Sequence, residues 1–179
     1  MKSLCFICVM VFLLSVSCKK QKTAQTPTAS WFGSVSYKRN GIKYDAKIVS
    51  TKDIVPADSS KIQITIVRFN DSGEPRDQLN FGNISSSVHI DTLIEGLVDT
   101  FGNKEKGKPY TFFSLALDDG DAIAFYSLFY SEVRILRITS YDSLTKEIKG
   151  EFETTYIPSI HSRFDTMRFK EGVFYTKVQ

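Results

Sequence analysis

The chain has 179 residues and a formal net charge of +3 at pH 7. A charge this close to balance gives no electrostatic basis for binding nucleic acid, so nucleic acid is not expected among the partners. The three cysteines, Cys5, Cys8 and Cys18, all lie near the N-terminus, which excludes a disulfide framework and a zinc–thiolate site in the remainder of the chain.

The N-terminal segment has the layout of a secretory signal. Lys2 precedes an apolar stretch from Leu4 to Leu14, far shorter than the roughly 20 apolar residues that a membrane-spanning helix needs. The small residues Ser15-Val16-Ser17 then lead to Cys18, which cleavage would leave as the new first residue. This arrangement resembles the lipobox of bacterial lipoproteins, whose cysteine carries fatty acyl chains. Residues 1–17 are therefore predicted to be a signal peptide, and Cys18 the lipidation site.

Residues 18–30 are predicted to form a lipidated flexible tether. The stretch from Lys19 to Ser30 is polar and has no bulky apolar side chain, so it cannot bury enough surface to offset its ordering entropy. Acyl chains on Cys18 would make the membrane a partner of the protein. Surface-exported lipoproteins of the Bacteroidota commonly carry acidic residues after this cysteine, whereas Lys19 and Lys20 are basic. By that resemblance, the protein is expected on the outer membrane, facing the periplasm.

Residues 31–179 are predicted to form a single all-β domain, because short runs rich in Ile, Val, Thr, Phe and Tyr recur between turn signals. Asn40-Gly41 favours a tight hairpin turn, since both residues readily take positive φ angles. An antiparallel meander of about eight or nine strands is expected. The runs from which it is built are 35–38, 42–49, 61–70, 78–84, 110–117, 122–130, 133–141, 147–157, 164–169 and 173–178.

Three of these runs carry more specific predictions. In 147–157, Ile148 and Phe152 alternate with charged residues, so one face should meet a core and the other water. The run 122–130 has no clean polar face and should lie centrally or line a shielded cavity. Lys170-Glu171-Gly172 is expected to turn a last hairpin between the two final runs.

One segment, 90–101, fits a short helix and a strand about equally. Its apolar residues fall at the offsets of a helical stripe, but Gly96 weakens a helix and a strand would also place large apolar residues inward. A helix here would pack against an open end or a face of the sheet. The residues of the stripe are Ile90, Leu93, Ile94, Leu97, Val98 and Phe101.

The strands can close into a barrel or stack as a sandwich, and closure has the advantage that it leaves no exposed edge. The order of motifs resembles uncharacterised Bacteroidota lipoproteins with a lipocalin-like, or calycin-like, β-barrel domain. The resemblance implies a barrel and a cell-envelope address, and it supplies no established reaction. It is carried by Asn40-Gly41-Ile42-Lys43-Tyr44-Asp45-Ala46, Ile138-Thr139-Ser140-Tyr141-Asp142, Ile148-Lys149-Gly150-Glu151-Phe152 and Phe169-Lys170-Glu171-Gly172-Val173-Phe174.

The sequence favours no catalytic, metal or cofactor site. His89 and His161 are the only histidines, and neither belongs to a recognisable nucleophile motif. The acidic run Asp118-Asp119-Gly120-Asp121 is better explained as a solvated hairpin turn than as a calcium loop. The protein is therefore expected not to be an enzyme, and no cofactor is predicted.

Aromatic residues are the better functional signal. They gather in two central runs and would fill a core or line a cavity that takes one small ligand. The candidate ligand-binding residues are Phe112, Tyr126, Phe129 and Tyr130. We expect a binding module for a small apolar or amphipathic ligand or a glycan, with a structural lipoprotein that docks another envelope protein as the alternative. An open barrel interior would favour a ligand, and a packed one a protein partner.

Overall fold

The structure is a computed structural model, and it describes residues 32–52, 61–96, 107–116, 122–158 and 165–179. Within these ranges every regular element is a strand, and no helix has the length and apolar character that a membrane span requires. The strands are β1 (Gly33–Arg39), β2 (Ile42–Lys52), β3 (Lys61–Phe69), β4 (Pro75–Ser85), β5 (Asp91–Leu93), β6 (Tyr110–Ala116), β7 (Ala122–Leu128), β8 (Ile135–Tyr141), β9 (Glu147–Pro158) and β10 (Met167–Lys177).

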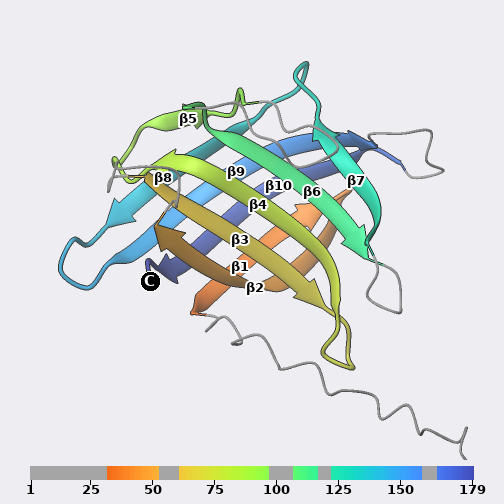
Figure 1. The fold of residues 1–179 in the computed structure, drawn as a ribbon, viewed down its shortest axis with the longest axis horizontal. Coiled ribbons are helices and arrows are strands. Elements are labelled where there is room, and N and C mark those ends of the chain that lie inside the picture. Colours follow the sequence, from red (N-terminus) through yellow and green to blue (C-terminus); the bar gives the residue numbers. More distant parts are fainter. Residues whose placement is uncertain (1–31, 53–60, 97–106, 117–121, 159–164) are drawn as a thin grey trace, which may run out of the picture.

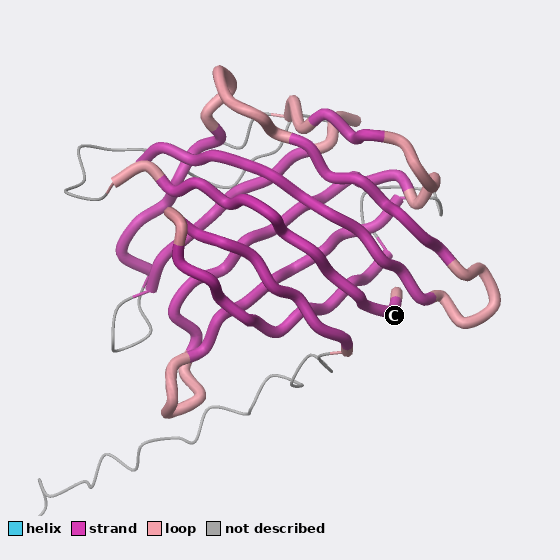
Figure 2. The backbone as a smooth tube through the Cα atoms, turned by 180° about the vertical axis from the view of Figure 1, so that it is seen from behind, coloured by secondary structure: helices cyan, strands magenta, loops and turns pink. Residues whose placement is uncertain are grey.

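Eight strands close into an antiparallel barrel, as Figures 1 and 2 show. The order is β10-β1-β2-β3-β4-β6-β7-β9, and the pairing of β9 with β10 completes the ring. Strand β9 is long enough to pair twice along one edge, with β7 near its C-terminal end and with β8 along its first half. Strand β5 extends this side by pairing with β8. The predicted barrel is therefore confirmed, and the alternative, a β-sandwich, is wrong.

The first hairpin is confirmed at Asn40-Gly41. Asn40 has φ 48° and Gly41 has φ 84°, the left-handed pair that a two-residue turn between twisted strands requires. The side-chain amide of Asn40 also binds the backbone at the start of β10. Its Nδ2 donates to the Thr166 carbonyl at 2.9 Å, and its Oδ1 accepts from the Arg168 N–H at 2.8 Å. The turn is thereby fixed to the start of β10.

The helix considered for 90–101 is wrong in the part that the structure describes. Asp91–Leu93 is strand β5, and its burial alternates as a strand requires: Leu93 is 44% exposed, whereas Ile94 is fully buried. The backbone N–H of Ile94 donates to the Arg134 carbonyl at 3.0 Å. Pairing with β8, which is distant in sequence, thus overrides the local helical spacing. Leu97, Val98 and Phe101 lie outside the described residues.

The last predicted hairpin is also wrong, because β10 is one continuous strand. It pairs with β1 on one side and β9 on the other, and the two registers shift at overlapping places on β10: between Lys170 and Val173 against β1, and between Phe169 and Gly172 against β9. Glu171 there has φ 52°, which fits a β-bulge. The residues expected to turn the chain instead bend a strand that its two neighbours hold in place.

Aromatic rings fill the middle of the barrel. Phe113 of β6 and Phe169 of β10 have ring centroids 5.0 Å apart, although these strands are not neighbours in the ring of strands. Phe81 of β4 and Phe152 of β9 likewise meet at 5.3 Å. Contacts between non-adjacent strands mean that side chains occupy the central level of this small barrel.

Glycines on the inner wall make room for these rings. A Cβ added to Gly172 would lie 2.6 Å from two ring carbons of Phe152, so the Gly172→Ala variant must displace a packed ring. We expect it to lower the free energy of unfolding by about 1–3 kcal/mol, measured by urea denaturation. In a Phe152→Leu background the loss should shrink, because the clashing ring carbons are gone. If the losses of the Gly172→Ala and Phe152→Leu substitutions simply add in the double variant, the Phe152 ring is not what opposes a side chain at position 172.

Candidate functional site at the hairpin end of the barrel

The four candidate ligand-binding residues do not share one site. Tyr126 is 2% exposed and belongs to the core cluster inside the barrel. Phe112 and Phe129 are half-buried, and Tyr130 is 38% exposed. The run 122–130 was expected to lie centrally or line a shielded cavity; its Tyr126 is buried inside the barrel, but Phe125 beside it points outward and is 52% exposed. Of the four, only Tyr126 belongs to the buried interior.

A buried ionic cluster, which we call the arginine–aspartate cluster, consists of Arg39, Arg68 and Asp77. The Asp77 side chain is only 3% exposed, and its Oδ2 accepts hydrogen bonds from Arg39 Nη1 at 2.6 Å and from Arg68 Nε at 2.7 Å. The strands β1, β3 and β4 each place one member on the inner face. Two guanidinium groups thus share one carboxylate oxygen inside the barrel wall.

Two tyrosine rings flank the cluster. The Arg39 guanidinium lies 4.6 Å, and that of Arg68 5.5 Å, from the ring centroid of Tyr44, within cation–π range. Tyr37 stacks on Tyr44 with centroids 5.9 Å apart. Burial, reinforced by the charge of Asp77, raises the pKa of Tyr37. Burial alone would lower the pKa of Arg39, but the charge and hydrogen bond of Asp77 outweigh it and the pKa is raised. Both groups therefore stay protonated at neutral pH.

Tyr126 is linked to the cluster through Phe113. The Phe113 ring centroid lies 5.9 Å from the Arg39 guanidinium and 5.2 Å from the Tyr126 ring. The Tyr126 hydroxyl is buried and forms no hydrogen bond with any described residue. Burial raises its pKa, with a contribution from the exposed carboxylate of Asp165. A buried hydroxyl without a partner is costly, so its retention calls for an explanation.

Tyr156 provides the contrasting case deeper in the barrel. Thr111 donates to the Asn80 carbonyl at 2.6 Å, so the Tyr156 hydroxyl, 2.5 Å from Thr111 Oγ1, acts as the donor between the two side chains. Both tyrosine hydroxyls are thus buried, but only that of Tyr156 is satisfied by the fold. Comparing Tyr126 with Tyr156 therefore separates the effect of burying a hydroxyl on stability from the effect of its hydrogen bond.

Removing each hydroxyl should therefore have opposite effects on stability. In ligand-free protein, Tyr126→Phe should raise the free energy of unfolding by about 1 kcal/mol, because a desolvated, unbonded group is lost. Tyr156→Phe should lower it by about 1–2 kcal/mol, because a buried hydrogen bond is lost. Denaturation curves of the two variants at equal protein concentration measure both changes. A fall in stability for Tyr126→Phe would show that its hydroxyl is already satisfied.

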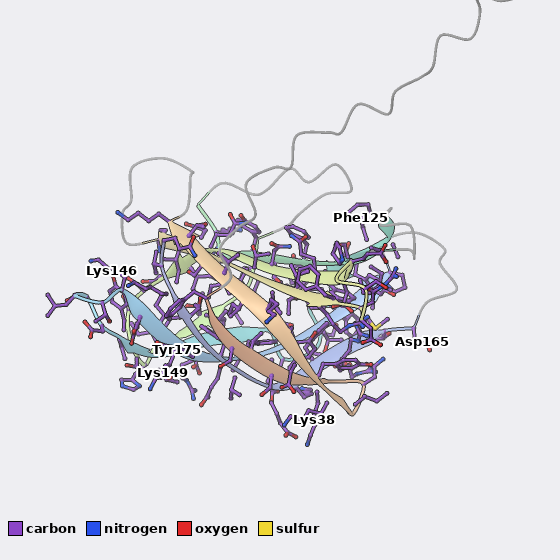
Figure 3. All side chains as sticks on the ribbon, turned by 90° about the horizontal axis from the view of Figure 1, so that it is seen from below. Lys38, Phe125, Lys146, Lys149, Asp165 and Tyr175 are labelled. Atoms are coloured by element: carbon purple, nitrogen blue, oxygen red, sulfur yellow. The ribbon has the colours of Figure 1, made fainter. Side chains whose placement is uncertain are left out.

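The cluster lies at the hairpin end of the barrel, the end at which β1 passes into β2, β3 into β4, β6 into β7 and β9 into β10. Asp77 pairs with Arg68 and Leu115, close to the ends of their strands. Figure 3 shows Phe125 and Asp165 at one end of the barrel and Lys146 at the other. Half-buried Leu115 and Met167 lie against the core at the hairpin end, so the charged groups have apolar neighbours.

Two hollows lie on the outer surface of the barrel. One, of about 310 Å³, crosses β8, β9 and β10 and is lined by residues that include Arg137, Glu151 and Val173. The second, of about 530 Å³, crosses β2, β1 and β10 and is lined by residues that include Ser36 and Tyr175, with Val173 again at its side. The outer face is therefore a second surface on which a partner could be held.

Several residues considered from the sequence are not part of this site. Cys18, His161 and the acidic run 118–121 lie outside the described residues. His89 is exposed and adopts φ 61°, and its backbone N–H donates to the Ile138 carbonyl at 2.8 Å. A backbone role at the edge of the sheet accounts for this residue.

Arg39, Arg68 and Asp77, the residues that give the hairpin end its charge, were not among the sites predicted from the sequence. The signal was present, since Arg39 follows inward Tyr37 by two positions and Arg68 follows inward Ile66 by two. A period of two places these charged side chains on the inner face, where charge is rare unless it is paired.

Comparisons of the chain with family models, with curated proteins and with solved structures find no match.

Proposed function

We propose that this protein is a lipid-anchored cell-envelope binding module that takes a small amphipathic ligand at the hairpin end of its barrel. The observation that carries the proposal is the buried Tyr126 hydroxyl, which has no partner among the described residues. The Tyr126 ring contacts Phe113, which in turn contacts Arg39 of the arginine–aspartate cluster. A ligand group that bonds this hydroxyl would remove its desolvation cost. Phe113 and Leu115 would contact the apolar part of such a ligand.

The filled middle of the barrel favours a protein partner over a ligand in the deep interior, so a ligand can be held only at the end of the barrel. Phe113 and Phe169 close the central level, so a long apolar chain along the barrel axis is not supported. The ligand would instead be held above these rings, with its polar group toward Arg39, Arg68 and Tyr126. A compact amphipath fits this depth better than an extended lipid.

The proposed anchor is compatible with this placement. Acylation at Cys18 would tether the domain through residues 18–30, and the described chain enters β1 at Gly33, opposite Thr176 on β10. The Val178 N–H donates to the Lys146 carbonyl at 3.0 Å, so this entry lies at the end of the barrel opposite the cluster. The hairpin end would then face away from the point of attachment. Replacing Cys18 with Ser should release the protein from membrane fractions and abolish labelling by radioactive palmitate.

A neutral apolar fluorophore tests the ligand site. Phenylnaphthylamine should bind the purified Cys18→Ser protein saturably, and a Tyr126→Ala substitution should weaken binding about tenfold, equivalent to about 1.4 kcal/mol. Phe125→Ala is the matched control, because the neighbouring ring points out of the barrel. Near-ultraviolet circular dichroism would establish that each variant is folded. Absence of saturable binding, or equal losses in both variants, would count against the proposal.

The second candidate function is docking of another envelope protein on the outer face. It is favoured by the two hollows that adjoin at Val173, which is 49% exposed on β10. Here, a Val173→Arg substitution should abolish crosslinking to a protein partner in intact membranes and leave fluorophore binding unchanged. The opposite pattern, lost dye binding in Tyr126→Ala with crosslinking intact, would favour the ligand site.

A further inference from the structure

We infer that the ligand of the hairpin end is an amphipathic organic anion, with one negative charge on a compact apolar body; this inference rests on the proposed function and narrows its ligand class. The first observation is charge. The cluster joins Arg39 and Arg68 to the single carboxylate of Asp77, so one positive charge is left in excess. The side chains are mostly buried, with 12%, 26% and 3% exposed for Arg39, Arg68 and Asp77. Excess charge at this depth favours an incoming anion, because screening by water is weak.

The second observation is the geometry of the donors. A guanidinium carries several N–H groups in a planar fork, and Asp77 engages only one on each arginine, both through the same oxygen. The Tyr126 hydroxyl adds a neutral donor that no described residue uses. Carboxylate, sulfonate and phosphate-ester oxygens each accept several such bonds, and charge-assisted hydrogen bonds are the stronger ones.

The third observation is what surrounds the charge. Leu115 pairs with Asp77 across β6 and β4, and it also pairs with Ala124 of β7. Phe113 lies one pair deeper, in contact with Tyr126, and closes the floor. An inorganic anion would leave the half-buried side chain of Leu115 partly exposed, whereas an apolar body attached to the anion would cover it. Two charged residues, Arg39 and Asp165, act electrostatically on Tyr126. Asp165 is exposed to solvent, which screens its repulsion of a bound anion.

Two fluorophores of similar shape separate the anionic group from the apolar body. Anilinonaphthalene sulfonate carries a negative charge and phenylnaphthylamine does not. We expect the Cys18→Ser protein to bind the sulfonate about tenfold more tightly than the neutral dye, with the difference set by the cluster. The anion of 2-naphthoic acid, a compact amphipathic carboxylate, should displace the sulfonate, whereas inorganic phosphate at the same concentration should not.

Substitutions in the cluster should shift the affinity for the sulfonate in opposite directions. Arg68→Met removes a positive charge and should weaken sulfonate binding about tenfold, with little effect on the neutral dye. Asp77→Asn keeps an acceptor oxygen but removes the competing negative charge, so it should strengthen sulfonate binding several-fold. Lys149→Met is the control, because it removes a positive charge from the exposed face of β9 and should change neither affinity.

The outcomes separate the two proposals. Equal affinities for both dyes, or an Asp77→Asn variant that does not strengthen sulfonate binding, would overturn the anion inference and leave the binding module in place. Displacement of the sulfonate by phosphate alone would also overturn it, since the site would then take a free anion. If neither dye binds, the binding module itself is refuted. Should Arg68→Met or Asp77→Asn not fold, the affinities of the two dyes for the Cys18→Ser protein and the displacement by phosphate decide.

Discussion

Replacing Phe169 with alanine is expected to lower the free energy of unfolding by about 3–5 kcal/mol, the range for truncating a large buried aromatic residue. Phe169 is fully buried, and its ring lies 5.0 Å from Phe113, 5.3 Å from Tyr37 and 5.6 Å from Tyr156, measured between centroids. It thus contacts rings of the two neighbouring strands, β1 and β9, and a ring of β6 across the interior. Because proteins of this size are stable by only about 5–15 kcal/mol, the variant should be close to unfolding. Guanidinium denaturation followed by tyrosine fluorescence measures the change.

Phe125→Ala is the control for that prediction. It removes the same side chain from β7, but from the outer face, where 52% of the residue is exposed. Little apolar surface returns to water on truncation there, so the unfolding midpoint should hardly move. Similar losses in the two variants would contradict the assignment of Phe169 to a ring cluster that fills the barrel.

Replacing Asp77 with alanine should be comparably severe. The substitution leaves Arg39 and Arg68 without the carboxylate that both bind, and removing one partner of a buried ion pair typically costs about 3–5 kcal/mol. The neighbouring Tyr37 and Tyr44 rings cannot replace that charge. Chemical denaturation at two salt concentrations would measure the effect, and the low exposure of Asp77 predicts that added salt changes it little.

The matched comparison is Asp91→Ala. Asp91 of β5 also holds an arginine through two hydrogen bonds, with Oδ1 2.5 Å from Nε and Oδ2 2.9 Å from Nη2 of Arg137, but its side chain is 47% exposed. Water and salt screen exposed pairs, so this substitution should change stability far less than Asp77→Ala. If the two losses were alike, burial would not be what distinguishes the arginine–aspartate cluster.

Local patterns in the sequence predict most of the barrel. The alternation of Ile148, Phe152 and Tyr156 with charged residues correctly assigns the two faces of β9. Asn40-Gly41 correctly marks a tight turn because its backbone preference is a property of those two residues. Local chemistry is decisive in these places, and there the predictions are confirmed.

The predictions fail where strands distant in sequence decide the outcome. The apolar residues Ile90, Leu93 and Ile94 have helical spacing, but Asp91–Leu93 pair with β8 as a strand. Glu171 and Gly172 are residue types that favour turns, but β1 and β9 pair with β10 on both sides, so these residues form a bulge within one continuous strand. Both corrections reflect hydrogen bonds that no window of neighbouring residues contains.

The functional site illustrates the same limit. The aromatic surplus pointed to β7, and Tyr126 is indeed inside the barrel, but Phe112 and Tyr130 are partly exposed elsewhere. Alternation within each strand is enough to place the side chains of Arg39, Arg68 and Asp77 on the inner face of the barrel. Their convergence on one carboxylate oxygen depends on the registers of β1, β2, β3 and β4 together, which the sequence alone does not specify.

The position of a bound probe tests the central claim most directly. Isotope-labelled Cys18→Ser protein saturated with anilinonaphthalene sulfonate should give intermolecular nuclear Overhauser effects between the dye and the side chains of Tyr126 and Leu115. Those contacts would place the dye at the hairpin end, above the ring of Phe113. Contacts confined to Val173 and Tyr175 on the outer face would instead contradict a ligand site inside the barrel.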